Sequence, residues 1–305
     1  MDLTTPARPA SPGPAGTADL GSWLSPVENR GGRLYKREDL AALPTGVNGS
    51  KLRACEHLIG RAARAGARRV ISAASVLSPQ SAMAAVLAER HGLACTVVVG
   101  GTKPSTAVRH PSVRMAVDHG ASLEFAAVGY NPALQAYARG LAAVDPRAYW
   151  LQYGITTPPD ATREELRAFH EVAARQTANL PRVETLVVPF GSGNTAAGVL
   201  MGLAQRRSAD RPQRTVLVGI GPDRRAWLAD RFAAMGLDLP EYEHLDLHGS
   251  GYAAYGDKMP GTADGIRLHP TYEGKVVRYL NEKRPEWWTR RDGTACLWIV
   301  GGPIS

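Results

Sequence analysis

Short apolar runs separated by stretches of helical periodicity recur along most of this chain. The runs that predict strands are residues 69–74, 94–99, 122–127, 184–190 and 214–220. The stretches that predict helices are residues 52–63, 80–91, 111–119, 132–144, 163–179, 196–206 and 224–235. Strands that alternate with helices in this way indicate βαβ units, in which helices cover both faces of a parallel sheet. The sequence therefore predicts an α/β fold.

The alternation occurs in two blocks, which predicts two lobes within the 305 residues. A small α/β domain over residues 56–154 is expected to be inserted into a large domain formed by residues 1–55 and 155–305. This length allows each lobe to bury a core of its own. Residues 1–20, which are rich in proline, glycine and alanine, are expected to form a flexible tail.

The chain carries 36 Lys and Arg against 28 Asp and Glu, a formal net charge of +8. A basic balance is typical of proteins with a nucleic-acid or phosphate-bearing partner, but a bias in composition alone also produces it. The three cysteines (Cys55, Cys95 and Cys296) lack the spacing of a disulfide framework or a zinc site. Without a signal-peptide pattern or an apolar run long enough for a membrane helix, the sequence predicts a cytoplasmic protein with no membrane partner.

A glycine-rich turn follows the strand predicted at residues 184–190 and precedes a predicted helix. It consists of Gly191, Ser192, Gly193, Asn194 and Thr195. Main-chain N–H groups at such a turn, together with the start of the helix, favour the binding of an anion such as a phosphate. Two alternatives stay open. One is a tight turn whose glycines serve packing, and the other is a dinucleotide-binding turn, although the acidic residue expected about 20 residues further on is missing.

Lys51 lies in a second turn rich in glycine, asparagine and serine, just before the helix predicted at residues 52–63. A lysine near a helix start is usually a solvated surface residue. Lysine is also the side chain that forms Schiff bases when it is removed from water, because its pKa falls readily on burial. The sequence alone leaves both interpretations of Lys51 open.

Several motifs occur together in one order along the chain. They are KREDL at residues 36–40, NGSKLR at 48–53, SVLSPQ at 75–80, GSGNT at 191–195, YEGK at 272–275 and GGP at 301–303. In this order the motifs resemble those of the fold-type II pyridoxal-phosphate enzymes, in particular the family of 1-aminocyclopropane-1-carboxylate deaminase and D-cysteine desulfhydrase. The resemblance implies a fold similar to that of the tryptophan synthase β subunit, with two three-layer α/β domains that each contain a parallel sheet. It also implies a homodimer.

The resemblance further implies pyridoxal 5'-phosphate as the cofactor and a role for several residues. Lys51 would form a Schiff base with the cofactor and later move the α-proton of the substrate. The glycine-rich turn would hold the cofactor phosphate through main-chain donors. Glu273 would face the pyridine nitrogen, where a carboxylate favours the protonated, electron-withdrawing ring. Tyr272 and Ser78 would lie near the substrate as acid–base or orienting groups.

The chain also departs from the family pattern. The Ser-Asn-His of the family is Ser78-Pro79-Gln80 here, so Pro79 has no side-chain amide to support the cofactor, and Gln80 is expected to substitute in part. Ser50 precedes the lysine where the family has asparagine, and it is expected to contact the cofactor. Since the cofactor residues are kept and several substrate-reading residues are changed, we expect a substrate other than the usual ones of the family.

A basic segment near the end of the chain, residues 275–291, contains six basic and two acidic residues interleaved with Tyr279, Trp287 and Trp288. Cations and aromatic rings in this pattern can follow a phosphate backbone and stack on bases. The alternative is an amphipathic helix over residues 272–283 with a solvated basic face, followed by tryptophans that pack into the large domain.

Three functions are consistent with these features. The first is a pyridoxal-phosphate-dependent lyase of the deaminase or desulfhydrase type, which acts at the α-carbon of a small amino acid. The second is a decarboxylase or eliminase with the same cofactor that acts on an amino acid attached to a nucleotide or to DNA, as in modified phage DNA. The third is a non-catalytic binding protein with this fold. The eight histidines are scattered and form no HExxH motif, so no metal site is expected.

Overall fold

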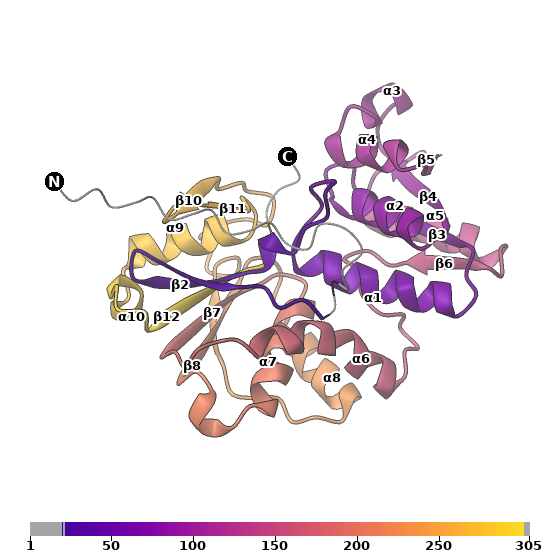
Figure 1. Ribbon diagram of the computed structural model, residues 1–305. Coiled ribbons are helices and arrows are strands. Elements are labelled where there is room, and N and C mark those ends of the chain that lie inside the picture. Colours follow the sequence, from indigo (N-terminus) through magenta and orange to yellow (C-terminus); the bar gives the residue numbers. More distant parts are fainter. Residues whose placement is uncertain (1–19, 21, 302–305) are drawn as a thin grey trace.

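The computed structural model of the chain describes residue 20 and residues 22–301, and it has two α/β lobes (Figure 1). The larger sheet contains six strands, in the order β1 (Val27–Arg30), β2 (Arg33–Arg37), β12 (Ala295–Ile299), β7 (Thr185–Phe190), β8 (Arg214–Gly219) and β9 (Glu243–Asp246). All neighbouring pairs in this sheet are parallel except β1 and β2, which form an antiparallel hairpin at one edge.

The smaller sheet contains four parallel strands, in the order β5 (Ser122–Ala126), β4 (Ala94–Gly100), β3 (Arg69–Ala73) and β6 (Ala148–Leu151). A separate antiparallel hairpin joins β10 (Gly261–Ala263) to β11 (Ile266–Leu268). The expected α/β class with parallel sheets is therefore confirmed, with the β1–β2 hairpin as an antiparallel addition to the larger sheet.

Helices connect the strands in both lobes. Those of the first half are α1 (Ser50–Arg64), α2 (Gln80–Arg90), α3 (Pro104–Ala107), α4 (Pro111–Asp118) and α5 (Asn131–Ala143). Those of the second half are α6 (Arg163–Ala174), α7 (Asn194–Gln205), α8 (Arg225–Met235), α9 (Glu273–Lys283) and α10 (Glu286–Thr289). The helix expected over residues 163–179 is shorter than predicted, because a 3-10 turn at Arg175–Thr177 follows α6.

The smaller sheet is covered on both faces, as its alternating side chains require. Val70 and Val97 contribute to a core shared with α1, α2 and α4, whereas Ile71 and Val98, one position further along their strands, pack against α5. Successive residues of a strand point to opposite faces, so an uninterrupted apolar strand demands a helix layer on each side. Each fully buried aliphatic side chain of this kind contributes about 1.5–3 kcal/mol to folding.

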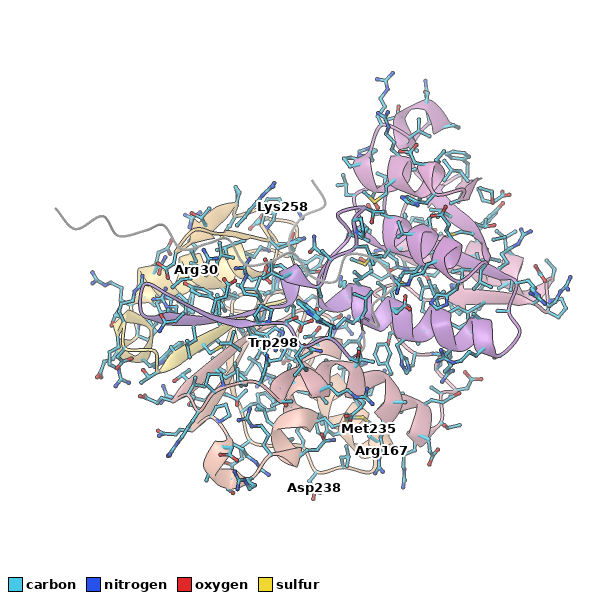
Figure 2. The ribbon with its side chains drawn as sticks, viewed as in Figure 1. Arg30, Arg167, Met235, Asp238, Lys258 and Trp298 are labelled. Carbon is cyan, nitrogen blue, oxygen red and sulfur yellow. The ribbon has the colours of Figure 1, made fainter. Side chains whose placement is uncertain are left out.

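The larger sheet is built by the same rule. Leu186 and Val188 of β7 belong to a core with α6, α7 and α8, while Val187 between them belongs to a core with α9 and α10. Trp298, labelled in Figure 2, is fully buried on the α7 side of β12. Both sheets therefore lie inside three-layer lobes.

Helix α1 joins the two lobes. The expected domain boundary between residues 55 and 56 falls inside this continuous helix, and both Leu52 and Leu58 contribute to the core of the smaller sheet. We therefore propose that the small domain begins with α1. Most of the expected tail lies outside the described residues, whereas Leu20, its last residue, is fully buried. Within the part of the chain that the structure describes, no helix combines the length and the apolar character needed to cross a membrane.

Candidate active site

A cavity of about 350 Å³ is formed where α1, α2 and α7 begin. It contains every predicted site residue except Glu273, together with several residues that the sequence did not single out. The predicted residues that line it are Ser50, Lys51, Ser78, Gln80, Gly191, Ser192, Gly193, Asn194, Thr195 and Tyr272. Residues separated by more than 200 positions in the sequence thus share one cavity between the lobes.

Lys51 is held at this cavity by the tight entry into α1. Gly49 has φ +93, and a Cβ atom at this position would lie 2.5 Å from the carbonyl oxygen of Val300. The N–H of Ser50 donates to the same carbonyl at 2.8 Å. A glycine is required here both by the backbone conformation and by the close approach of residue 300. The residue that directly follows β12 therefore helps to fix the position of the lysine.

Tyr272 lies directly beside the lysine. Its hydroxyl is 3.3 Å from Lys51 Nζ and 3.5 Å from the hydroxyl of Tyr255. A Cβ atom on Gly191 would lie 3.1 Å from the Tyr272 ring, so the glycine leaves room for this ring. Burial raises the pKa of Tyr272 above its ordinary value, which keeps the hydroxyl protonated and able to donate.

The glycine-rich turn connects β7 to α7, as the sequence predicts. Gly193 has φ +95, and a Cβ atom there would lie 2.3 Å from the ring of Trp227. The side chains at the start of α7 are held in place: Thr195 Oγ1 donates to Ser50 Oγ at 3.1 Å, and Asn194 Nδ2 donates to the carbonyl of Ile155 at 3.2 Å. Gly191, Ser192 and Gly193 line the cavity with small side chains or none, so their main-chain N–H groups are accessible to a bound phosphate.

Glu273 is placed differently from the other predicted residues. It is fully buried at the start of α9 and is not among the residues that line the cavity. Its Oε1 accepts the N–H of Val300 at 2.5 Å, and its Oε2 accepts the N–H of His269 at 3.2 Å. Burial raises the pKa of Glu273 to about 8, an effect that these main-chain donors only partly oppose. Its expected position facing the pyridine nitrogen stays a prediction.

Gln80 has its carboxamide engaged within the protein. Its Nε2 donates to Ser72 Oγ at 3.2 Å and to the carbonyl of Gln152 at 3.1 Å, and its Oε1 accepts the N–H of Gly154 at 2.9 Å. Both N–H groups of the amide are thereby used. Gln80 thus connects the start of α2 to the segment after β6, and its expected support of the cofactor stays a prediction.

The cations at the cavity differ in how far they are already paired. Arg53 is fully buried and donates to Glu38 at 3.1 Å, to the hydroxyl of Ser25 at 2.8 Å and to the carbonyl of Leu20. Lys258, in contrast, is exposed at the cavity and donates only to the neutral hydroxyl of Thr271, at 2.6 Å, among the described residues.

Tyr153, Tyr255, Lys258 and His269 also line the cavity, although the sequence analysis assigned them no role. Burial, followed by the nearby charges of Lys51 and Lys258, lowers the pKa of His269 to about 4, so the imidazole is neutral. These residues lie in segments without regular secondary structure, and no sequence pattern signals their convergence. The YEGK motif at residues 272–275 is the one sequence signal close to any of them, because it follows His269 by three residues.

The basic segment, residues 275–291, packs against the large lobe. Trp288 is 1% exposed, and the guanidinium of Arg33 lies 3.4 Å from the centroid of its ring. Four of the six cations have partners: Lys275 donates to two carbonyls, Arg278 pairs with Glu282, Arg290 with Glu184 and Arg291 with Asp264. This packing agrees with the amphipathic-helix alternative, since Trp288 is buried in the large lobe and Trp287 is partly buried against the same core. No group of three or more potential metal ligands occurs among residues 20 and 22–301.

Comparison with known proteins agrees with this geometry. A family model described as "Pyridoxal-phosphate dependent enzyme" matches residues 24–286. A protein of Salmonella phage ViI named O-seryl-dTMP PLP-dependent decarboxylase is 30% identical, over 88% of this chain and 77% of its own length. The D-cysteine desulfhydrase of Salmonella paratyphi A is 26% identical, over 89% of this chain and 87% of its own.

A solved structure described as a 1-aminocyclopropane-1-carboxylate deaminase homologue has the same fold, with a TM-score of 0.71 and 22% identity over 94% of this chain and 91% of its own. The resemblance based on the sequence motifs is therefore confirmed. The donors around the cavity also fit the cofactor, since Lys51 supplies an amine and the turn at residues 191–195 supplies main-chain N–H groups beside the cavity. The chain belongs to the family of pyridoxal-phosphate-dependent enzymes, with the fold of the fold-type II group.

Proposed function

We propose that this chain is a lyase that removes the α-carboxylate from an amino acid whose side chain is joined to a pyrimidine nucleotide. The proposal favours the second of the three functions over a reaction on a small free amino acid. It is supported by the relative from Salmonella phage ViI, whose name describes a decarboxylase of serine linked to dTMP. A decarboxylase is also a lyase, so the broader reaction class expected from the sequence is kept.

The observation that carries the proposal is the state of the α2 N-terminus, which borders the cavity. Helix starts normally offer free N–H groups to a carboxylate. Here Pro79 has no N–H, the N–H of Ser78 donates to Ser75 at 2.8 Å, and that of Gln80 donates to the hydroxyl of Ser78 at 3.3 Å. The N–H of Ala82 donates to Ser112 at 3.3 Å.

A lyase that eliminates an amine or a thiol must hold the substrate carboxylate throughout the reaction, whereas a decarboxylase must release it. Most N–H donors of the α2 N-terminus are already used within the protein, and Arg53 is bonded to Glu38. This wall of the cavity is therefore poorly suited to binding a carboxylate. Leu77, Pro79 and Met83 add apolar surface to the same wall. Because a charged carboxylate is disfavoured in apolar surroundings, this wall favours its loss as neutral carbon dioxide.

When bound, pyridoxal phosphate supplies an electron sink for the bond that breaks at the α-carbon. The chain must then return a proton to that carbon. Lys51 Nζ and the hydroxyl of Tyr272, 3.3 Å apart, can share a proton, and the raised pKa of Tyr272 keeps one available. His269, neutral because its pKa is about 4, adds no second positive charge to the pair.

The second candidate is elimination of an amine or thiol from a free amino acid. The pair of Lys51 and Tyr272 favours it, because the same two groups can remove an α-proton as well as deliver one. The relative named D-cysteine desulfhydrase also supports it.

The holoenzyme distinguishes these candidates when it is incubated separately with O-seryl-dTMP, free serine and D-cysteine. We expect carbon dioxide from O-seryl-dTMP in a 1:1 ratio to the substrate consumed, with no ammonia or sulfide from the free amino acids. Ammonia or sulfide without carbon dioxide would establish the second candidate instead. A holoenzyme that turns over none of the three would favour the non-catalytic alternative.

A further inference from the structure

An irregular segment of the large lobe, residues 253–260, lies between β9 and the β10–β11 hairpin and borders the cavity. It is held by the N–H of Met259, which donates to the carbonyl of Pro270 at 2.8 Å, and by the bond from Lys258 Nζ to Thr271. Figure 2 shows Lys258 at the edge of the large lobe that is nearer to the small lobe. The segment therefore places the Lys258 ammonium at the edge of the cavity, bonded to Thr271, the residue that precedes Tyr272.

Lys258 is the cation at this cavity that is best placed to meet a ligand. Arg53 is buried with Glu38, and Lys51 is assigned to the cofactor. No carboxylate of the described residues forms a salt bridge with Lys258. An exposed, unneutralised ammonium beside a cavity binds a phosphate as a point charge.

Two tyrosines supply flat apolar surface at the same cavity. Tyr153 follows β6 of the small lobe and Tyr255 belongs to segment 253–260 of the large lobe, and they are 41% and 43% exposed. Both are close enough to Tyr272 to influence its titration, and the Tyr255 hydroxyl is 3.5 Å from that of Tyr272. Exposed tyrosine rings are surfaces on which a nucleobase stacks, at the cost of little conformational freedom.

We propose that Tyr153, Tyr255 and Lys258 form a subsite for the part of the substrate that does not react. The tyrosines contact the planar pyrimidine ring and Lys258 pairs with the phosphate of the nucleotide. This inference rests on the proposed function, because it names the residues of the same cavity that recognise the nucleotide. It moves nucleotide recognition from the basic segment 275–291, where the sequence suggested it, to the edge of the cavity.

Binding of ligands that cannot react tests the subsite without any chemistry. The holoenzyme is titrated by calorimetry with dTMP, thymidine and inorganic phosphate. We expect Lys258→Gln to weaken dTMP binding roughly tenfold or more, with thymidine binding unchanged, and Lys258→Arg to restore most of the loss for dTMP. Tyr153→Leu and Tyr255→Leu should weaken both nucleoside ligands roughly fivefold or more. Lys283→Gln, the same change at an exposed lysine that does not line the cavity, is the matched control.

Two results would overturn the subsite. One is wild-type binding of dTMP no tighter than that of inorganic phosphate. The other is an equal loss of thymidine and dTMP binding in Lys258→Gln, which would mean that the lysine supports the shape of the cavity and does not read a phosphate. Cofactor absorbance retained by each variant shows that it is folded.

The subsite and the proposed reaction can fail separately. Binding of dTMP that depends on Lys258, without release of carbon dioxide from O-seryl-dTMP, would contradict the reaction alone. Release of carbon dioxide that is insensitive to all three residues would contradict the subsite alone.

Discussion

The hydroxyl of Tyr272 lies 3.3 Å from Nζ of Lys51, across 221 positions of sequence. The lysine lies in the first turn of α1, and the tyrosine directly precedes α9, which covers the face of the larger sheet opposite to α7. Packing of the two lobes against each other therefore brings the two groups together. Their contact is the most direct sign of acid–base chemistry in the cavity.

Tyr272→Phe removes the hydroxyl of this pair and keeps the ring that packs against Gly191. If the hydroxyl supplies or relays a proton, kcat should fall about 100-fold to 10,000-fold. Steady-state assays at saturating substrate measure the change, and cofactor absorbance checks that the site is loaded. Tyr137→Phe, which removes an exposed hydroxyl on α5, is the control and should match the wild type. A Tyr272→Phe enzyme with wild-type kcat would show that the tyrosine only packs.

Lys51→Ala tests the attachment of the cofactor. The purified wild-type protein should show the near-visible absorbance band of a lysine-bound pyridoxal phosphate, and the variant should lack it. Lys103→Ala, at an exposed lysine before α3, should keep the band. An unchanged band in Lys51→Ala would assign the attachment to a different lysine.

Gly193→Ala introduces a side chain where the backbone has φ +95 and where Trp227 would lie 2.3 Å from the new atom. Strain and overpacking together should lower the free energy of unfolding by roughly 2 kcal/mol or more, and cofactor affinity should fall because the turn must shift. Urea unfolding and a cofactor titration measure the two effects. Gly140→Ala, in α5 with open space around it, should stabilise the protein by about 1 kcal/mol.

Glu273 gives a pH dependence of defined sign. Its pKa is raised from 4.5 to about 8 in the folded state, so folding favours the protonated acid. Its contribution to stability is complete below about pH 4.5 and is lost as the pH rises through 8. In the cofactor-free protein, the melting temperature of the wild type should therefore fall relative to Glu273→Gln between these pH values.

The same measurement on the holoenzyme tests the position of Glu273. A protonated pyridine nitrogen beside the carboxylate would favour its charged form and lower the raised pKa. The fall in melting temperature with pH, measured for the wild type relative to Glu273→Gln, should then be smaller when the cofactor is bound. An identical slope with and without cofactor would show that Glu273 does not face the ring.

The sequence predicted the fold through features that act locally. Strands such as β4 and β7 are apolar on both faces, and the predicted bounds differ from the observed ones by a single residue at one end. Weaker elements were missed. Strand β6 has only four residues, and β12 directly follows a turn that separates it from α10. Short strands acquire their identity from their neighbours in the sheet, which a local pattern does not contain.

Some residues of the site were predicted from the sequence and others were not. Motifs with a special backbone, such as the turns at Gly49 and Gly193, were found because glycine signals a conformation that other residues avoid. Lys258 and Tyr255 were not found, because an exposed lysine and tyrosine in a loop have no local signature. For the basic segment, the sequence shows the cations but not Glu184 and Asp264, which pair with two of them, so binding of nucleic acid by this segment stays a prediction.

Strand β12, the last strand among the described residues, lies in the middle of the larger sheet, between β2 and β7. Translation therefore delivers the central strand after all its neighbours, and until then β2 has no parallel partner. Val300, which directly follows β12, also accepts the N–H of Ser50 at the entry to α1, so the middle of the larger sheet and the turn before Lys51 depend on the same segment. A change that disrupts β12 should therefore disturb both the larger sheet and the position of the reactive lysine.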